Sequence, residues 1–157
     1  MSLTIRQYNP DSGALLSNVS QISFGKITAG TRSKVVCIDI AFSEVTEVSN
    51  LKLGLISSGG LNVTSSASDT SNNLDGSSTR GFFGIQTSAS FDSSIASAPL
   101  TSFFKSINAT VTASDTNNVE IPTRSATLSN YIYLDISVDS SSVGANSGSW
   151  KIFFDFS

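Results

Sequence analysis

The amino-acid sequence predicts an all-β protein, folded as a sandwich of about seven strands with one short helix. Several segments alternate apolar and polar residues with the period of two that marks a half-buried strand. Runs rich in Gly, Ser, Thr and Asn separate these segments and favour turns. The 157 residues suffice for one domain whose core needs no disulfide or metal.

The alternating segments are the predicted core strands. The first, Ile22 to Ile27, contains Gly25, and Gly30 then supplies a turn. The later strands are expected at 36–42, 51–56, 81–86, 118–121, 131–138 and 149–156. The residues expected to be buried on their shared face are Phe24, Ile38, Ile40, Leu53, Leu134, Ile136, Trp150, Ile152 and Phe154. Because the last strand is rich in aromatic residues, we expect it to be paired within the sheet or against another subunit.

One segment breaks the β pattern and predicts the short helix. Leu100, Phe103, Phe104 and Ile107 follow the i, i+3, i+4, i+7 spacing of a helix face. Pro99 suits the first turn of such a helix. We expect this helix to close one end of the sandwich with its aromatic residues in the core.

The residue types present argue against catalysis. Because the chain contains no histidine, the Ser-His-Asp and Cys-His nucleophile arrangements and histidine-based metal sites are excluded. Asp39 and Asp135 fall on the polar faces of predicted strands, which gives little support to carboxylate catalysis. The single cysteine, Cys37, is expected to be a small apolar residue in or near the core. We therefore predict no enzymatic activity, no cofactor and no metal requirement.

One cluster of polar residues resembles a calcium loop in composition only. The side chains ahead of Gly76 that carry oxygen ligands are Asp69, Asn72, Asn73 and Asp75. The EF-hand spacing fails, because Phe82 stands where the loop requires an acidic ligand. An ordinary turn is the better account, and an irregular calcium site is the alternative.

The charge and hydropathy patterns argue against nucleic acids and membranes as partners. Only 13% of the residues are charged, and the net charge is −3. The nine basic residues are scattered, whereas nucleic-acid binders cluster Lys and Arg, so no nucleic acid is expected. No apolar run approaches the roughly 20 residues of a membrane-spanning helix. No signal peptide is evident at Met1 to Pro10, so synthesis in a cytoplasm is expected.

An internal similarity links two polar segments. Leu61–Leu74 matches Ile107–Val119 with a one-residue gap, and a Thr-Arg pair follows each of them. One interpretation is that two similarly built strand-loop units reach the same side of the domain and contact a partner. The other is that Ser/Thr/Asn-rich loops resemble one another by composition alone. Under the first interpretation, the candidate contact residues are Asn72, Asn73, Asn117 and Asn118.

The N-terminal residues predict a second contact element. We expect residues 1–18 to form an arm and residues 19–157 to form the sandwich domain. Pro10 and Gly13 interrupt the arm, which suits a segment that orders on a neighbouring subunit by strand addition. Its candidate partner-binding residues are Leu3, Ile5 and Tyr8. The alternative is a first strand packed on its own domain.

Two resemblances extend these expectations. The stretch Ser23–Gly30, with the sequence SFGKITAG, resembles the opening of immunoglobulin-like sandwich modules, and implies an immunoglobulin-like or jelly-roll-type sandwich. The whole sequence is similar in style to small structural proteins of tailed-bacteriophage virions, which share its few charges, many Ser, Thr and Asn residues and aromatic terminal strand. This resemblance implies a capsid decoration (cement) protein or a tail component. It would be a homo-oligomer that binds the major capsid or tail proteins and is located in the virion.

A different class of function stays open. A carbohydrate-binding or adhesin sandwich, such as a receptor-binding module of a tail or baseplate, would use exposed aromatic rings to stack on sugars. Tyr131 and Tyr133 are the candidates for that role.

Overall fold

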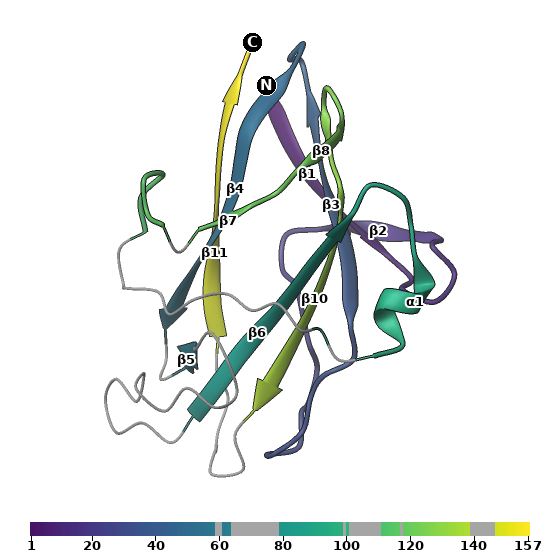
Figure 1. Cartoon of the computed structure of the whole chain (residues 1–157), viewed down its shortest axis with the longest axis vertical. Coiled ribbons are helices and arrows are strands. Elements are labelled where there is room, and N and C mark those ends of the chain that lie inside the picture. The colour runs from purple at the N-terminus through teal and green to yellow at the C-terminus, as the bar shows by residue number, and fades with distance from the viewer. Residues whose placement is uncertain (59–60, 64–78, 99, 101–110, 117, 139–146) are drawn as a thin grey trace.

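The structure is a computed structural model that describes residues 1–58, 61–63, 79–98, 100, 111–116, 118–138 and 147–157. These residues form two β-sheets and one short helix (Figure 1). The predicted all-β sandwich is confirmed. The described residues contain eleven strands instead of about seven, because several strands of two or three residues accompany the predicted long ones.

The larger sheet follows the order β2-β1-β3-β10-β6-β5, and the short strands β8 and β9 extend it from β3. Its strands are β1 (Ser2–Tyr8), β2 (Leu15–Val19), β3 (Val36–Ser43), β5 (Leu61–Val63), β6 (Thr79–Ser88), β8 (Thr123–Ser125), β9 (Leu128–Ser129) and β10 (Tyr131–Val138). All pairs in this sheet are antiparallel except β5 with β6. The smaller sheet has the order β11-β4-β7, formed by β4 (Val48–Ser58), β7 (Val119–Glu120) and β11 (Ser147–Phe156).

The main core lies between the two sheets, where the predicted alternating faces meet. Of the residues expected in it, Ile38, Ile40, Leu53, Leu134 and Ile136 are buried. The remaining four, which are partly buried and pack against this core, are Phe24, Trp150, Ile152 and Phe154. Aromatic pairs join the sheets, with Phe42 and Phe154 ring centroids 4.7 Å apart. The period of two therefore identified the face of β3, β4, β10 and β11 that meets the main core.

The segment from Ile22 to Ile27 is a correction to the prediction, because it is not a strand. Gly25 and Gly30 adopt positive φ angles of 70° and 79°, which only glycine tolerates readily and which interrupt an extended strand. Ile22, Phe24 and Ile27 still pack against the main core. The apolar spacing thus identified residues that contact the core, although these residues do not form a strand.

The N-terminal residues are a second correction. Residues 2–8 form β1, which pairs with β3 along its whole length, from Ser2 opposite Ser43 to Tyr8 opposite Cys37. β2 then pairs with the second half of β1. Residues 1–18 are therefore part of the chain's own sheet, as in the alternative interpretation, and do not form a separate arm.

The helix predicted from Leu100 to Ile107 lies almost wholly outside the described residues. The described helix is α1 (Ser93–Ala96), and the carboxylate of Asp92 caps it by accepting a hydrogen bond of 2.9 Å from the backbone N–H of Ser94. Leu100 is buried but lies outside any helix, and Phe103, Phe104 and Ile107 lie outside the described residues. In Figure 1, α1 and β2 lie on the same side of the molecule.

Candidate functional site

The outer face of the larger sheet carries a second, smaller core. We call it the outer cluster, and its buried members are Tyr8, Val35, Cys37, Leu100 and Tyr133. Phe91, Ile95, Ala96 and Tyr131 pack against it from the connection after β6 and from the start of β10. The sequence placed Asp39 and Asp135 on this face, as the polar side of their strands. The covering connection makes it a buried layer instead.

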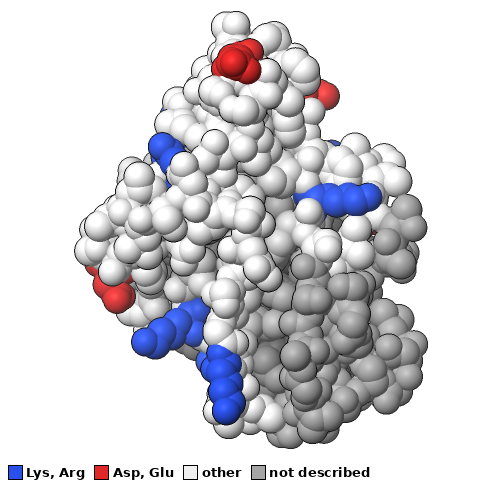
Figure 2. Space-filling view, turned by 180° about the vertical axis from the view of Figure 1, so that it is seen from behind, with Lys and Arg blue, Asp and Glu red and all other residues white. Residues whose placement is uncertain are grey.

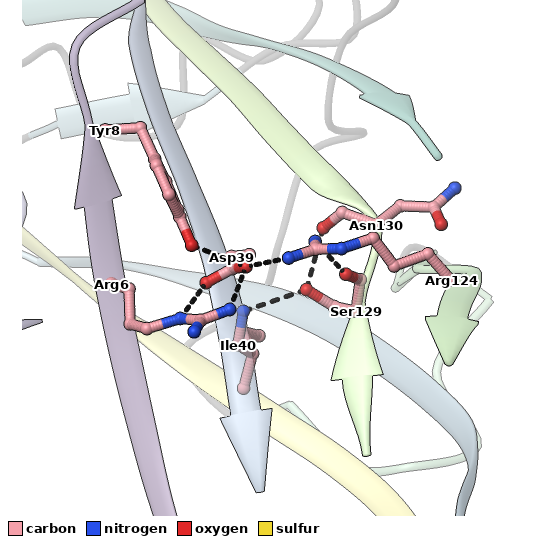
Figure 3. A network of polar contacts seen from close by, with 7 residues as sticks. All are labelled: Arg6, Tyr8, Asp39, Ile40, Arg124, Ser129 and Asn130. Atoms are coloured by element: carbon pink, nitrogen blue, oxygen red, sulfur yellow. Dashed lines mark hydrogen bonds and ion pairs between the residues drawn. The ribbon is translucent and has the colours of Figure 1, made fainter. Parts of the chain in front are cut away.

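A buried carboxylate next to the outer cluster binds two arginines (Figure 3). Asp39 on β3 is fully buried, and Arg6 lies directly opposite it on β1. Arg6 donates two hydrogen bonds to the carboxylate, from Nε to Oδ1 at 2.8 Å and from Nη2 to Oδ2 at 2.5 Å. The Tyr8 hydroxyl donates a third at 3.0 Å, and Arg124 Nη2 donates a fourth to Oδ2. The planar guanidinium of Arg6 suits this bidentate geometry.

Arg124 connects this carboxylate to the end of the short strand β9. Its guanidinium also donates to the backbone carbonyl of Ser129 and lies over the Tyr131 ring, 4.1 Å from the ring centroid. The Ser129 hydroxyl accepts a hydrogen bond of 2.8 Å from the Ile40 N–H and donates to the Asn130 carbonyl. These contacts tie together β1, β3, β8 and the turn between β9 and β10.

The electrostatics of Asp39 follow from these contacts. Burial alone would raise the pKa of its carboxyl, but hydrogen bonds from Arg6, Arg124 and Tyr8 outweigh burial and hold the pKa below its ordinary value. The side chains of Arg6 and Arg124 are 26% and 16% exposed, so most of each guanidinium stem is covered. The carboxylate is thus ionised and fully paired, which is the pattern of a structural ion pair.

A second buried carboxylate, Asp135 on β10, is held in a similar way. Its Oδ2 accepts hydrogen bonds from Arg32 Nη1 at 3.0 Å and from the backbone N–H of Leu100 at 3.3 Å. A Cβ atom at Gly84 would lie 2.1 Å from Asp135 Oδ1, so only glycine fits opposite this carboxylate on β6. Asp39 therefore fixes β1 and β8 to the sheet, and Asp135 binds the connection after β6 through the Leu100 N–H.

Cys37 lies between two tyrosines of the outer cluster, opposite Tyr8 on β1 and Tyr133 on β10. It is fully buried, and this burial raises the pKa of its thiol to about 12. The prediction of an inert core cysteine is confirmed, because a thiol with this pKa forms almost no reactive thiolate at neutral pH.

The two tyrosines proposed to stack on sugars both make contacts within the chain. Tyr133 is fully buried, and its hydroxyl accepts a hydrogen bond of 2.8 Å from the Asp92 N–H. The Tyr131 ring contacts Arg124, Tyr8 and Phe91. The expectation that these tyrosines are exposed is therefore wrong, because the chain after β6 folds back over them.

The predicted partner-binding residues fall into three groups. Leu3 and Ile5 are half-buried and pack on the main core, and Tyr8 is buried. Asn118 is half-buried, and its Nδ2 donates to the Thr112 carbonyl at 2.8 Å, so it stabilises its own loop. Asn72, Asn73 and Asn117 lie outside the described residues, as do most residues of the two related loops.

Exposed hydrophobic side chains identify a different surface. Among the described residues, the large hydrophobic side chains that are exposed are Met1, Leu15, Leu16 and Phe156, each between 54% and 58%. Leu15 and Leu16 lie on β2, the edge strand of the larger sheet, and Phe156 lies on β11, the edge strand of the smaller one. The pairing of β2 with β1 ends at Ile5, so the first residues of β1, which follow Met1, extend beyond β2. We call the exposed edge of β2 that carries Leu15 and Leu16 the sheet-edge surface.

Charged side chains show no comparable gathering on the face drawn in Figure 2, where they are few and spread among uncharged residues. In the part of the chain that the structure describes, no group of three His, Cys, Asp or Glu side chains is arranged to hold a metal ion. Of the described helices, none has the length and apolar character to span a membrane.

Comparison of the chain with protein-family models, with curated proteins and with solved structures gives no match. The candidate site therefore depends on the geometry of the sheet-edge surface and of the two buried carboxylates.

Proposed function

We propose that the chain is a non-enzymatic structural protein of a phage virion, a capsid decoration protein that binds the particle in many copies through its sheet-edge surface. The observation that supports this proposal is the position of Leu15 and Leu16. These exposed leucines lie on an edge strand whose outer N–H and C=O groups pair with no strand among the described residues. Strand addition uses this combination of an apolar contact and an unpaired edge.

The construction of the larger sheet supports the same role. Two buried carboxylates bind three arginines from different segments, and the outer cluster fixes the layer over the sheet. A body stiffened in this way loses little entropy when it binds, so even small contacts contribute to affinity. Repetition over a lattice then strengthens weak individual contacts, because each attachment raises the effective concentration for the next.

The composition agrees with this proposal. The low charge of the chain means that few ions must be desolvated when its surface is covered. The related loops Leu61–Leu74 and Ile107–Val119 stay a prediction as additional contacts. Sugar binding by Tyr131 or Tyr133 gains no support, since both rings are occupied within the chain.

The test is whether the protein occurs in particles at a fixed copy number. Particles of the phage that encodes the chain would be purified on a density gradient, and their proteins quantified by mass spectrometry against labelled peptides. We expect the chain at a constant ratio to the major capsid protein. Recovery only in the soluble fraction would overturn the proposal.

A binding assay then tests the surface. Particles that lack the chain would be mixed with the purified protein or with the double variant Leu15→Glu, Leu16→Glu. We expect the variant to lose binding, because two charges cannot be desolvated in an apolar contact. The matched control, Thr28→Glu with Ala29→Glu, adds the same charges at exposed positions outside the strands and should bind like the unmodified protein.

A further inference from the structure

The outer edge of β11 is unpaired in the part of the chain that the structure describes. β11 pairs with β4 on one side, from Ser147 opposite Ser58 to Phe156 opposite Val48, and no described strand pairs with its other side. Long, flat, uncapped edges of this kind promote pairing with another chain. Natural edge strands usually carry a proline, a bulge or several charges, and these features prevent pairing with another chain.

β11 has none of these protections along its pairing edge. It contains no proline and only two charged residues, Lys151 and Asp155. Its pairing with β4 has one register shift, between Phe153 and Asp155. Over this step β11 advances by two residues, whereas β4 advances by three, from Lys52 to Ser49. The extra residue therefore belongs to β4, next to Asn50 with its positive φ of 51°. β11 itself keeps a regular strand alternation.

The charge pattern of β11 is complementary to itself. Lys151 and Asp155 lie two residues before and two residues after Phe153, and all three share the face opposite Ile152 and Phe154. In an antiparallel pair of two identical strands centred on Phe153, each Lys151 lies opposite Asp155 of the second copy. Centring the pair on Lys151 or Asp155 places like charges opposite each other, which destabilises a strand pair.

We propose that two copies of the chain form a symmetric dimer by antiparallel pairing of their β11 strands, with the two Phe153 residues opposite each other. The dimer deepens the proposed function and rests on it for its role in a particle. A two-fold contact of this kind is isologous, so each copy contributes the same residues to both halves of the interface. It joins the two smaller sheets into one continuous sheet.

The inward side of the strand supports the same register. Trp150, Ile152 and Phe154 are only partly buried in one copy, and Phe156 is 58% exposed. In the proposed pair, Ile152 lies opposite Phe154 of the second copy and Trp150 lies opposite Phe156 of the second copy. Aromatic cross-strand pairs stabilise sheets, and this arrangement covers the most exposed aromatic side chain of the described residues.

The first experiment measures the mass of the full chain by sedimentation over a range of concentrations. We expect a dimer for the unmodified protein. Lys151→Asp should raise the dissociation constant about tenfold or more, because each of two ion pairs becomes a repulsion. The double variant Lys151→Asp, Asp155→Lys exchanges the charges and should restore the dimer. Lys34→Asp, a charge reversal at an exposed position outside β11, is the control and should not change the dissociation constant.

The second experiment tests the register directly and does not depend on charge. In the proposed pair, the two residues at position 153 have Cα atoms about 4.5 to 5.5 Å apart, which suits a disulfide. Phe153→Cys should therefore form a covalent dimer under mild oxidation, while the buried thiol of Cys37 does not react. Lys151→Cys is the matched control, because its two copies would lie on the order of 13 Å apart and should not join.

Several outcomes would overturn the pairing. These are a monomeric unmodified protein, a dimer that Lys151→Asp does not weaken, a double variant that fails to restore it, or cross-linking at 151 in place of 153. If Lys151→Asp does not fold, the cysteine variants still decide the register. A chain that is monomeric in solution but stoichiometric in particles would refute this dimer and leave the proposed function standing. A protein that forms this dimer in solution but is absent from particles would support the dimer and refute the proposed function.

Discussion

Arg6 and Asp39 lie directly opposite each other on β1 and β3, and the Arg6 guanidinium donates two hydrogen bonds to the buried carboxylate. This pair fixes the first strand of the chain to the centre of the larger sheet. Arg124 and Tyr8 donate to the same carboxylate, so one buried charge connects residues from three separate segments of the sequence.

Asp39→Asn should destabilise the fold by about 3 to 5 kcal/mol, because it leaves two partly buried guanidinium groups without their counter-charge. Urea denaturation at neutral pH measures the change in unfolding free energy. Asp11→Asn, in the exposed turn before β2, is the matched control and should stay within about 0.5 kcal/mol of the unmodified protein. A similarly small effect of Asp39→Asn would show that the ion pair contributes little.

Stability should fall in acid through the same carboxyl. The pKa of Asp39 is lower in the folded chain than in the unfolded chain, so the unfolded chain takes up the proton first as the pH falls. The resulting stability is present above the unfolded pKa of about 3.9 and is lost as the pH falls through the lower, folded value. Denaturation curves across this range should show a weaker pH dependence in Asp39→Asn than in the unmodified protein. Equal slopes would contradict the assignment.

Removing residues 1–18 should lower the melting temperature or prevent folding. The deletion takes away β1 and β2, exposes the edge of β3 and leaves Asp39 without Arg6 and Tyr8. Circular dichroism during heating would measure the effect. Removing only Met1, which precedes β1, is the control. A truncated protein with an unchanged thermal transition would instead favour the N-terminal arm expected from the sequence.

Cys37 should be unreactive in the folded protein, because it is fully buried and its thiol pKa is raised to about 12. A colorimetric thiol reagent at pH 8 should label the folded chain only slowly and label the urea-unfolded chain completely. Rapid stoichiometric labelling without denaturant would show that this part of the outer cluster opens readily.

The main core depends on the alternating faces, so Ile136→Ala should cost about 2 to 5 kcal/mol of unfolding free energy. Leu16→Ala removes a similar side chain from the exposed edge strand β2 and should cost less than about 0.5 kcal/mol. Denaturant titration of both variants compares the two sites under the same conditions. Equal losses would mean that β2 is covered in solution.

Local patterns in the sequence determined the all-β class and the buried face of the long strands. Ile38 and Ile40 on β3 and Leu134 and Ile136 on β10 alternate with polar residues, and a period of two places such residues on one side of a strand wherever it lies in the sheet. The absence of histidine from the sequence likewise excludes several kinds of catalytic site, whatever the fold.

Only the tertiary structure decided whether the opposite faces of these strands are buried. Alternation assigned Asp39 and Asp135 to the polar faces of their strands. Arg6, Arg32 and Arg124 neutralise them from distant segments. The connection after β6 packs against Tyr133 and hydrogen-bonds Asp135 through the Leu100 N–H. No local pattern records which segment folds over a face, since burial of a charge depends on partners that only the complete fold brings within hydrogen-bonding distance.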